Sequence, residues 1–198
     1  MEEMQRIHQD PKAYIAFLED PERDAYQKPD EVVSALNLKD GDVVADIGAG
    51  SGYFTFRLAQ HVGEKGRVYA VDIGPDMIDH IKQRIHNLGV KNVVTVLSHP
   101  DDPLLPKSSV DVLFFCEVWH HIEIENQTQN LTHMPQILKQ GGRVVMVDFQ
   151  KRDLPIGPPP MMRIAREDLL AQMQSNGFQL VKEHTFLPYH YFLEFNAK

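Results

Sequence analysis

A short apolar run that ends in a glycine-rich turn constrains the fold of this chain more than any other feature. Residues 43–55 read VVADIGAGSGYFT, with glycines at 48, 50 and 52 between a strand-like run and a helix-like segment. Because glycine has no Cβ, such a turn lets a ligand lie directly against the backbone beside a helix N-terminus. Ligands of open α/β sheets bind at the carboxyl ends of the strands, where this turn is expected. The segment therefore predicts a sheet with a ligand site at its edge.

The rest of the chain alternates between apolar runs and helix-like segments. Apolar runs without polar alternation are typical of parallel strands covered on both faces, and their alternation with helices indicates a doubly wound sheet. We expect Gly141 and Gly142 to end the third of the helices that follow the glycine turn. The expected strands are residues 43–47, 67–71, 93–97, 110–116 and 143–149, and the expected helices are residues 55–62, 75–87, 123–138 and 166–175.

The last two strand-like runs, residues 178–186 and 189–195, are separated only by Leu187 and Pro188. So short a connection cannot hold a crossover helix, and the two runs should therefore form an antiparallel hairpin. The predicted fold class is α/β: a doubly wound, mostly parallel seven-stranded sheet with an antiparallel C-terminal hairpin and helices on both faces.

The chain length predicts one principal domain. Its 198 residues suffice for one hydrophobic core but not for two full domains. Residues 1–40 are charged and helix-like, and we expect them to form an N-terminal helical cap over the ligand cleft, with Tyr26 or Lys28 reaching the ligand. Residues 41–198 are expected to form the principal domain.

Composition narrows the partners and the compartment. A formal net charge of −8 disfavours extended phosphate contacts, so no nucleic-acid partner is expected. Cys116, the single cysteine, allows neither an internal disulfide nor a multi-thiolate metal site, which suits a reducing compartment. The N-terminal sequence lacks the basic region and the apolar region of a secretory signal. The sequence also contains no run of about 18 apolar residues, so no membrane span is predicted. We therefore expect a cytoplasmic protein; the composition does not predict its oligomeric state.

The spacing of the glycines favours one kind of ligand. Dinucleotide sites prefer G-x-G-x-x-G, whereas here the third glycine comes one residue early and Tyr53 occupies the dinucleotide position. Asp46, two residues before the first glycine, suits a ligand with a positive ammonium group rather than a pyrophosphate. Asp72 ends the second predicted strand, 20 residues after Gly52, where an acid can accept both hydroxyls of a ribose.

The stretch D-I-G-A-G-S-G resembles the first motif of class I S-adenosylmethionine-dependent methyltransferases, and the resemblance extends over roughly residues 30–195. It implies a class I methyltransferase domain that binds S-adenosylmethionine, transfers a methyl group to a small-molecule substrate and releases S-adenosylhomocysteine. The resemblance implies that Asp46 orders the loop near the methionine end, that Asp72 binds the ribose, and that the adenine and ribose pack on Ile73 and Met77. The loop residues that it places along the ligand are Gly48, Ala49, Gly50 and Gly52.

Later segments add further candidates through the same resemblance. The acidic position after the third strand holds His99, so we assign the adenine contact to Asp101 in the turn that follows. The backbone at Cys116 and Glu117 should face the methionine portion of the cofactor.

The histidine pair that follows, His120 and His121, is expected near the reacting centre. Either histidine could take a proton from a hydroxyl or amine acceptor, although a structural, hydrogen-bonded role is an equal alternative for one of them. Adjacent histidines point in different directions, and no metal-binding spacing accompanies the pair. No metal site is predicted.

The acceptor and two rival functions remain open. The single cysteine disfavours arsenite as the acceptor, and no motif identifies another. Asp148 lies at the end of the fifth predicted strand, and the proline-rich residues 151–162 follow this strand, where substrate walls commonly form. The alternatives are an NAD-linked Rossmann oxidoreductase, which the glycine spacing and the hairpin disfavour, and a non-catalytic S-adenosylmethionine-binding protein.

Overall fold

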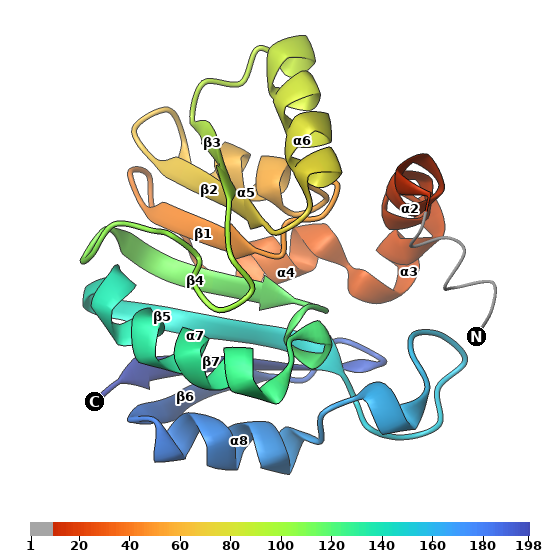
Figure 1. The fold of residues 1–198 in the computed structure, drawn as a ribbon, viewed down its shortest axis with the longest axis vertical. Coiled ribbons are helices and arrows are strands. Elements are labelled where there is room, and N and C mark those ends of the chain that lie inside the picture. The colour runs from red at the N-terminus through yellow and green to blue at the C-terminus, as the bar shows by residue number, and fades with distance from the viewer. Residues whose placement is uncertain (1–9) are drawn as a thin grey trace.

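Within residues 10–198, which the computed structural model describes, seven strands form one sheet in the order β3-β2-β1-β4-β5-β7-β6 (Figure 1). Strands β1 to β5 run parallel to one another. Strand β7 runs antiparallel to both of its neighbours, β5 and β6. The strands are β1 (Val43–Ile47), β2 (Arg67–Asp72), β3 (Val93–Leu97), β4 (Val110–Cys116), β5 (Leu138–Phe149), β6 (Phe178–His184) and β7 (His190–Ala197).

This sheet confirms the predicted α/β fold and its antiparallel hairpin. The reversed strand is not at the edge of the sheet, because β7 lies between β5 and β6. Dinucleotide-binding folds have the order 3-2-1-4-5-6. The insertion of β7 therefore argues against the oxidoreductase alternative.

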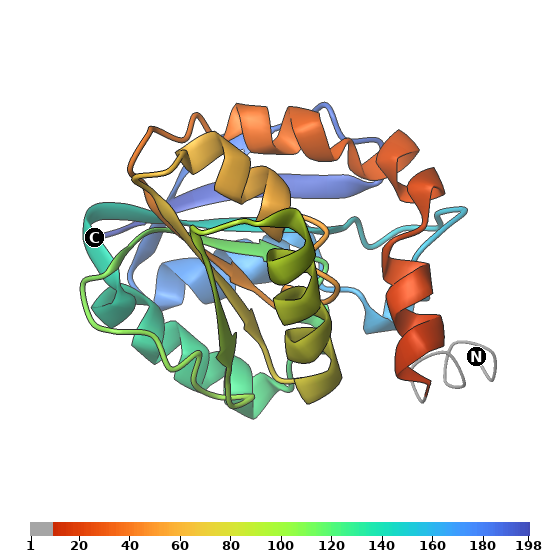
Figure 2. The ribbon, with the colours of Figure 1, turned by 90° about the horizontal axis from the view of Figure 1, so that it is seen from above.

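Helices cover both faces of the sheet, as Figure 2 shows from above. Val32 and Leu58 pack with Phe114 on the face covered by α4 and α5. Leu131 and Met173 pack with Phe115 on the face covered by α7 and α8. None of the helices within residues 10–198 combines the length and the apolar character that a membrane crossing requires. The α-helices are α2 (Pro11–Leu18), α3 (Asp24–Gln27), α4 (Pro29–Ala35), α5 (Thr55–Val62), α6 (Pro75–Leu88), α7 (Ile124–Ile137) and α8 (Arg166–Ser175), and the short 3-10 turns are η1 (Pro21–Arg23), η2 (Trp119–His121) and η3 (Pro160–Met162).

The predicted boundary at Gly141 and Gly142 was wrong. Helix α7 ends at Ile137, and β5 begins at Leu138 and runs through both glycines. Strand β5 pairs with β4 here: Val110 of β4 lies opposite Leu138 of β5, and the register of the two strands then shifts. A Cβ on Gly142 would lie 2.9 Å from the Lys139 carbonyl oxygen and 3.1 Å from that of Val110. The glycine therefore permits close backbone approach inside an irregular strand instead of ending a helix.

The described part of the predicted cap, residues 10–40, contains α2, η1, α3 and α4. Residues 1–9 begin the predicted cap and the N-terminal sequence that is expected to lack a secretory signal, and they lie outside the described residues. The side chain of Glu19 lies 2.9 Å from His80 and from Arg84 on α6. The segment after α2 is thereby fastened beside the carboxyl ends of β1 and β2.

Candidate functional site

The glycine turn after β1 requires its glycines for two reasons. Gly48, Gly50 and Gly52 have φ angles of 70°, 55° and 84°, in the left-handed region that side chains disfavour. A Cβ on Gly48 would also overlap the Val118 side chain, 2.9 Å from its Cβ. The backbone N–H groups of Gly48 and Ala49 donate to the Val71 carbonyl oxygen at 2.8 and 3.0 Å. The turn is thus folded tightly around the end of β2.

Asp72 joins the glycine turn to the start of α6. Its Oδ2 accepts the N–H of Gly50, and its Oδ1 accepts the N–H of Gly74, both at 2.8 Å. Burial raises the pKa of Asp72, although the backbone N–H groups at Gly74, Gly50 and Ile73 lower it in part. Each carboxylate oxygen can accept a second hydrogen bond. The group is therefore positioned to bind a vicinal diol at the carboxyl edge of the sheet.

Asp46 lies behind the turn, buried in the sheet. Its Oδ2 accepts the hydroxyl hydrogen of Thr55, the first residue of α5, at 2.6 Å. Burial raises the pKa of Asp46 to about 7, the Thr55 hydroxyl opposes this shift, and the charge of Asp72 adds to it. The carboxylate thus fastens the turn to the helix.

Glu117 follows β4 and has a φ of 56°. Its Oε1 accepts from Nε2 of His190 at 2.6 Å, and its Oε2 lies 3.4 Å from Nη2 of Arg23. Burial raises the pKa of Glu117, but His190, Arg23 and Gln27 lower it more strongly, to about 2. The group is consequently a fixed negative charge. Burial, with the charge of Glu117, raises the pKa of the neighbouring Cys116 thiol, which stays neutral.

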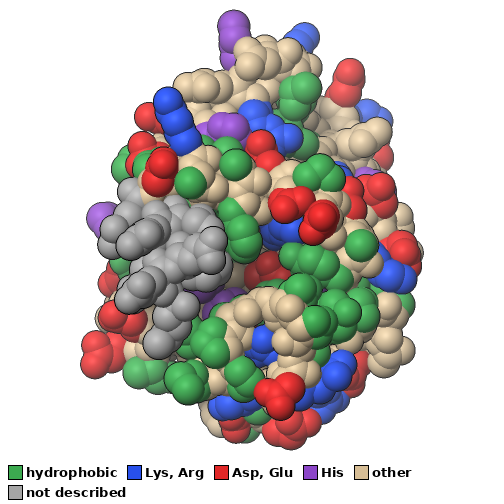
Figure 3. Space-filling view, turned by 90° about the vertical axis from the view of Figure 1, so that its right-hand side faces the viewer, with side chains coloured by type: hydrophobic (Ala, Val, Ile, Leu, Met, Phe, Trp, Pro, Cys, Tyr) green, Lys and Arg blue, Asp and Glu red, His purple; other side chains and the backbone are tan. Residues whose placement is uncertain are grey.

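The edge of the sheet therefore combines the chemistry that an adenosyl amino-acid ligand needs. Figure 3 looks onto this edge and shows a hollow with acidic side chains at its base and hydrophobic side chains gathered beside it. Ile73 is 60% exposed directly after Asp72, whereas Met77 and Ala49 are buried. The Ser51 hydroxyl in the glycine turn is buried and has no hydrogen-bond partner among the described residues. A ribose acceptor, an exposed apolar side chain and an unsatisfied hydroxyl fit S-adenosylmethionine.

Asp101 lies in a turn that is held from the side of α7. Asn130 donates to the Pro100 carbonyl oxygen at 2.9 Å, and Nδ1 of His133 lies 3.2 Å from the Asp101 carbonyl oxygen. These contacts fix the backbone of the turn. The assignment of the Asp101 side chain to the adenine remains a prediction.

The two adjacent histidines differ in their surroundings. The His120 side chain is 1% exposed, and its Nδ1 lies 2.7 Å from Oδ1 of Asp148. His121 is exposed, with its ring centroid 4.1 Å from that of His120. Across residues 10–198, no group of three His, Cys, Asp or Glu side chains is arranged to hold a metal ion. The structure therefore singles out His120 as one half of a buried carboxylate–imidazole pair.

A loop after β5 closes the same edge of the sheet. Arg163, only 3% exposed, donates to the carbonyl oxygens of Gln150, Arg152, Ile156 and Pro158 at 2.6 to 3.1 Å. Its guanidinium also lies 5.4 Å from the ring centroid of Phe149. One arginine thus fixes the shape of residues 150–163, the segment predicted to form a substrate wall.

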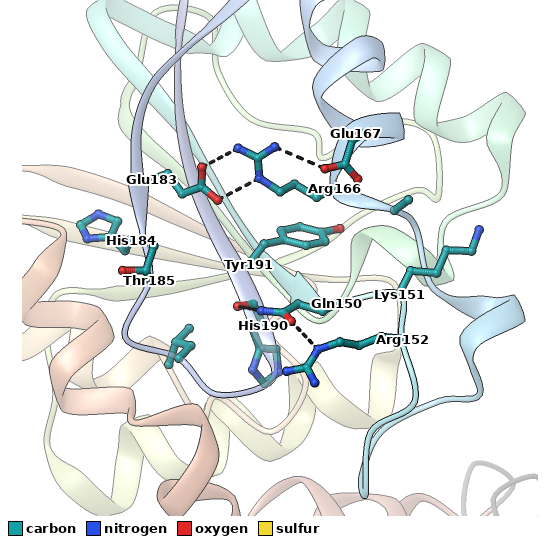
Figure 4. A pocket seen from close by; sticks show the side chains of 12 residues that line it. Gln150, Lys151, Arg152, Arg166, Glu167, Glu183, His184, Thr185, His190 and Tyr191 are labelled. Atoms are coloured by element: carbon teal, nitrogen blue, oxygen red, sulfur yellow. Dashed lines mark hydrogen bonds and ion pairs between the residues drawn. The ribbon is translucent and has the colours of Figure 1, made fainter.

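A pocket of about 300 Å³ lies between this loop, the start of α8 and the β6–β7 hairpin. In Figure 4, Arg166 reaches Glu183 on one side of the pocket and Arg152 is held by Gln150 on the other. The buried imidazole of His190 lines this pocket and also contacts Glu117, the residue that follows β4.

Sequence reasoning did not identify Arg23 or His190. Both residues reach Glu117 across long sequence separations, 94 and 73 residues. Neither belongs to a motif, and Arg23 is one of many charged residues in the predicted cap. Their convergence on Glu117 depends on the sheet order, which brings β7 beside β5, and on the position of η1 in the N-terminal segment.

A family model described as a methyltransferase domain matches residues 38–189. A ubiquinone/menaquinone biosynthesis C-methyltransferase from Pseudoalteromonas translucida is 29% identical over 122 residues, which cover 61% of this chain and 48% of that protein. An aklanonic acid methyltransferase from Streptomyces is 27% identical over 135 residues, which cover 67% of this chain and 60% of that one. The chain thus spans about half the length of these curated relatives.

Among solved structures, a SAM-dependent methyltransferase from Aquifex aeolicus superposes with a TM-score of 0.87 at 27% identity. The match covers 94% of this chain and 97% of that one. The similarity therefore includes the N-terminal segment and the reversed strand as well as the glycine turn.

Proposed function

Because the chain belongs to the class I S-adenosylmethionine-dependent methyltransferase family, we propose that it transfers the methyl group of S-adenosylmethionine to a small-molecule acceptor. The observation that carries the proposal is the double hydrogen bonding of Asp72, which joins the glycine turn to the start of α6. This contact holds a diol-binding carboxylate beside a backbone that a ligand can approach closely. The curated relatives named above support a small-molecule acceptor.

When bound, the cofactor supplies an electrophilic methyl group. The residues of this chain bind and orient it: Asp72 takes the ribose hydroxyls, Ile73 and Met77 pack on the adenosine, and Asp101 meets the adenine. Gly48, Ala49, Gly50 and Gly52 line the methionine end, with Asp46 holding the turn and the backbone at Cys116 and Glu117 facing it. Alignment of the reacting groups is the main contribution of the protein, and it can be worth about 7–11 kcal/mol.

We assign the removal of the acceptor's proton to His120. Asp148 accepts from its Nδ1, so the lone pair is on Nε2, which has no hydrogen-bond partner among the described residues. An imidazole held in this way can remove a proton from a hydroxyl or amine. His121, which is exposed beside it, contributes to the entrance of the site.

The acceptor approaches from the side of residues 150–163. The loop that Arg163 fixes and the pocket beside His190 provide a wall and a space at the carboxyl edge of β5. We further place the protein in the cytoplasm, which its single cysteine favours. Residues 10–40 act as the cap of the cofactor cleft, and residues 41–198 form the methyltransferase domain.

Calorimetric titration of the purified protein with S-adenosylmethionine, S-adenosylhomocysteine and NAD tests the proposal. We expect micromolar binding of the first two, none of NAD, and a loss of at least about tenfold in Asp72→Asn, since a charge-assisted hydrogen bond contributes about 1.5–3 kcal/mol. Asp79→Asn, at an exposed site on α6, is the matched control. Tight NAD binding, or no binding of either sulfur compound, contradicts the proposal.

A further inference from the structure

The acidic side chains that line the pocket beside His190 are already paired within the protein. Nε of Arg166 lies 2.8 Å from Oε1 of Glu183, and its Nη1 lies 3.5 Å from Oε1 of Glu167. The hydrogen bond from Arg166 lowers the pKa of Glu183, so this carboxylate is ionised and paired. His184, which also lines the pocket, lies 2.7 Å from Oε1 of Glu194.

Two basic side chains of the same pocket have no acidic partner among the described residues. Arg152 donates from Nε to Oε1 of Gln150 at 2.7 Å and from Nη2 to the Pro188 carbonyl oxygen at 3.0 Å, and both of these acceptors are neutral. Lys151 extends from the rim of the pocket in Figure 4 and has no partner within residues 10–198. Because the chain as a whole has a formal net charge of −8, this excess of positive charge is a local property of the pocket.

His190 adds a buried polar atom without a partner to the lining of the pocket. Its side chain is 0% exposed, and its Nε2 lies 2.6 Å from Oε1 of Glu117. Its Nδ1 has no hydrogen-bond partner among the described residues, which is unfavourable for a buried group. A polar ligand in the pocket can supply this partner, because Nδ1 accepts a hydrogen bond in the neutral ring and donates one in the charged ring.

The pocket has room for one substituted ring and lies close to the reacting centre. Its volume is about 300 Å³, whereas an apolar cavity of about 150 Å³ holds benzene. Leu187 and Tyr191 are buried in its lining and provide apolar contact area. The ring centroid of Phe149 lies 4.3 Å from that of His190 and 6.5 Å from that of His120. A ligand anchored beside His190 therefore needs to extend past only one ring to reach His120.

We propose that Arg152 anchors the methyl acceptor through an acidic group of that acceptor, with Lys151 at the rim and Nδ1 of His190 as a further hydrogen-bonding group. This inference rests on the proposed function and names its substrate class: small acids with one ring that carry a hydroxyl or amine away from the acid. The acid remains in the pocket while the hydroxyl or amine lies at His120. Arg152 is then a specificity-determining residue that takes no part in proton removal.

Three matched phenols test which charge the pocket selects. At the same ring position, 4-hydroxybenzoate is anionic, 4-hydroxybenzamide is neutral and 4-hydroxybenzamidine is cationic. Their dissociation constants are measured by ligand-observed NMR with the protein saturated with S-adenosylhomocysteine. We expect the acid to bind at least about tenfold more tightly than the amide, since charge-assisted hydrogen bonds are the stronger ones, and the amidine to bind most weakly. Inorganic phosphate is the fourth probe, and it should bind more weakly than 4-hydroxybenzoate.

Arg152→Met should remove the preference for the acid. We expect the variant to bind 4-hydroxybenzoate about tenfold more weakly and 4-hydroxybenzamide within about twofold of the unmodified protein, while Arg152→Lys keeps part of the preference. Lys151→Met should give a smaller loss, at most about fivefold, because exposed ion pairs contribute little. Lys91→Met is the matched control, because Lys91 is exposed before β3 at the opposite edge of the sheet.

The outcomes separate this proposal from the proposed function. Equal binding of the acid and the amide, binding of none of the three phenols, or an equal loss for both ligands in Arg152→Met overturns the proposal. Tighter binding of inorganic phosphate than of 4-hydroxybenzoate also overturns it, because the pocket would then be a site for a free anion. Failure of the protein to bind S-adenosylhomocysteine in calorimetry contradicts the proposed function itself, since that measurement needs no ligand in the pocket.

Discussion

The Nδ1 atom of His120 lies 2.7 Å from Oδ1 of Asp148, and both side chains are buried. A carboxylate can only accept in this contact, so the pair fixes one tautomer and leaves Nε2 as a proton acceptor. The backbone N–H of His120 lies 3.3 Å from the other oxygen of the same carboxylate. Asp148 therefore sets both the position and the tautomer of the imidazole.

His120→Gln should slow catalysis strongly without affecting cofactor binding. General base catalysis typically contributes about 10²–10⁴-fold, so kcat should fall at least about 100-fold. The measurement is S-adenosylhomocysteine release with a hydroxyl or amine acceptor that the unmodified protein methylates, and calorimetry should give an unchanged affinity for S-adenosylhomocysteine. His121→Gln serves as the control and should retain most of the activity. Similar rates in the two variants would show that His120 is structural.

Gly48→Ala should destabilise the protein far more than Gly89→Ala. Both glycines have positive φ, 70° and 65°, so the backbone strain is similar. A Cβ on Gly48 overlaps Val118, whereas nothing lies within 4 Å of one on Gly89. We expect a loss of about 1 kcal/mol at Gly89 and about 3 kcal/mol or more at Gly48 in urea unfolding. Equal losses at the two positions would contradict the steric account, and Val118→Ala should rescue Gly48→Ala in part.

Asp46→Asn should raise the free energy of unfolding at pH 8 but much less at pH 5. The raised pKa, about 7, means that the folded protein retains a proton that the unfolded chain loses near pH 4. Stability contributed by this group therefore falls as the pH rises from about 4 to 7 and is constant above that range. One pKa unit corresponds to about 1.4 kcal/mol, so the gain at pH 8 is at most about 4 kcal/mol.

Urea unfolding at the two pH values measures the difference, with Asp79→Asn as the exposed control. The same substitution should weaken cofactor binding at pH 8, because it removes a negative charge from behind the glycine turn. A gain in stability that is equal at pH 5 and pH 8 would show that the Asp46 carboxyl does not titrate in this range.

Arg163→Met should loosen the loop after β5 while the rest of the protein stays folded. The substitution removes four hydrogen bonds to carbonyl oxygens of half-buried and exposed residues, and a net hydrogen bond contributes about 0.5–1.5 kcal/mol. Limited proteolysis should then cut within residues 150–163 much faster than in the unmodified protein. Arg152→Met removes a neighbouring arginine that bonds to Pro188 on the exposed side and should leave the cleavage rate nearly unchanged.

Local patterns predicted most of the fold. The bounds of β1, β3, β4, α5 and α8 agree with the predicted ranges, because apolar runs bounded by glycine, proline or charged residues mark these elements in the sequence itself. The start of β5 was missed because Gly141 and Gly142 have the composition of a helix stop. Their actual role depends on the approach of Val110 from another strand.

The site residues also fall into those that the local sequence predicts and those that depend on contacts between distant segments. Asp46, the glycines and Asp72 were recognisable because the turn and the strand that follows it are continuous in sequence. His120 was predicted as a site residue from its sequence context, but its partner Asp148 is 28 residues away on the neighbouring strand. Arg23 and His190 meet Glu117 only because β7 is inserted beside β5 and the N-terminal segment crosses the edge of the sheet. No spacing rule within one segment predicts these contacts.

The place of β7 in the sheet also affects how the protein is made. Strand β6 leaves the ribosome before β7, yet among the described strands it pairs with β7 alone. Until residues 190–197 emerge, the outer edge of β5 is an unpaired row of backbone groups, which is prone to join the edges of other chains. A premature stop between β6 and β7 should consequently yield an aggregating fragment instead of a smaller folded protein. The newly made chain thus pairs the outer edge of β5 and forms its His190–Glu117 contact in the same late step.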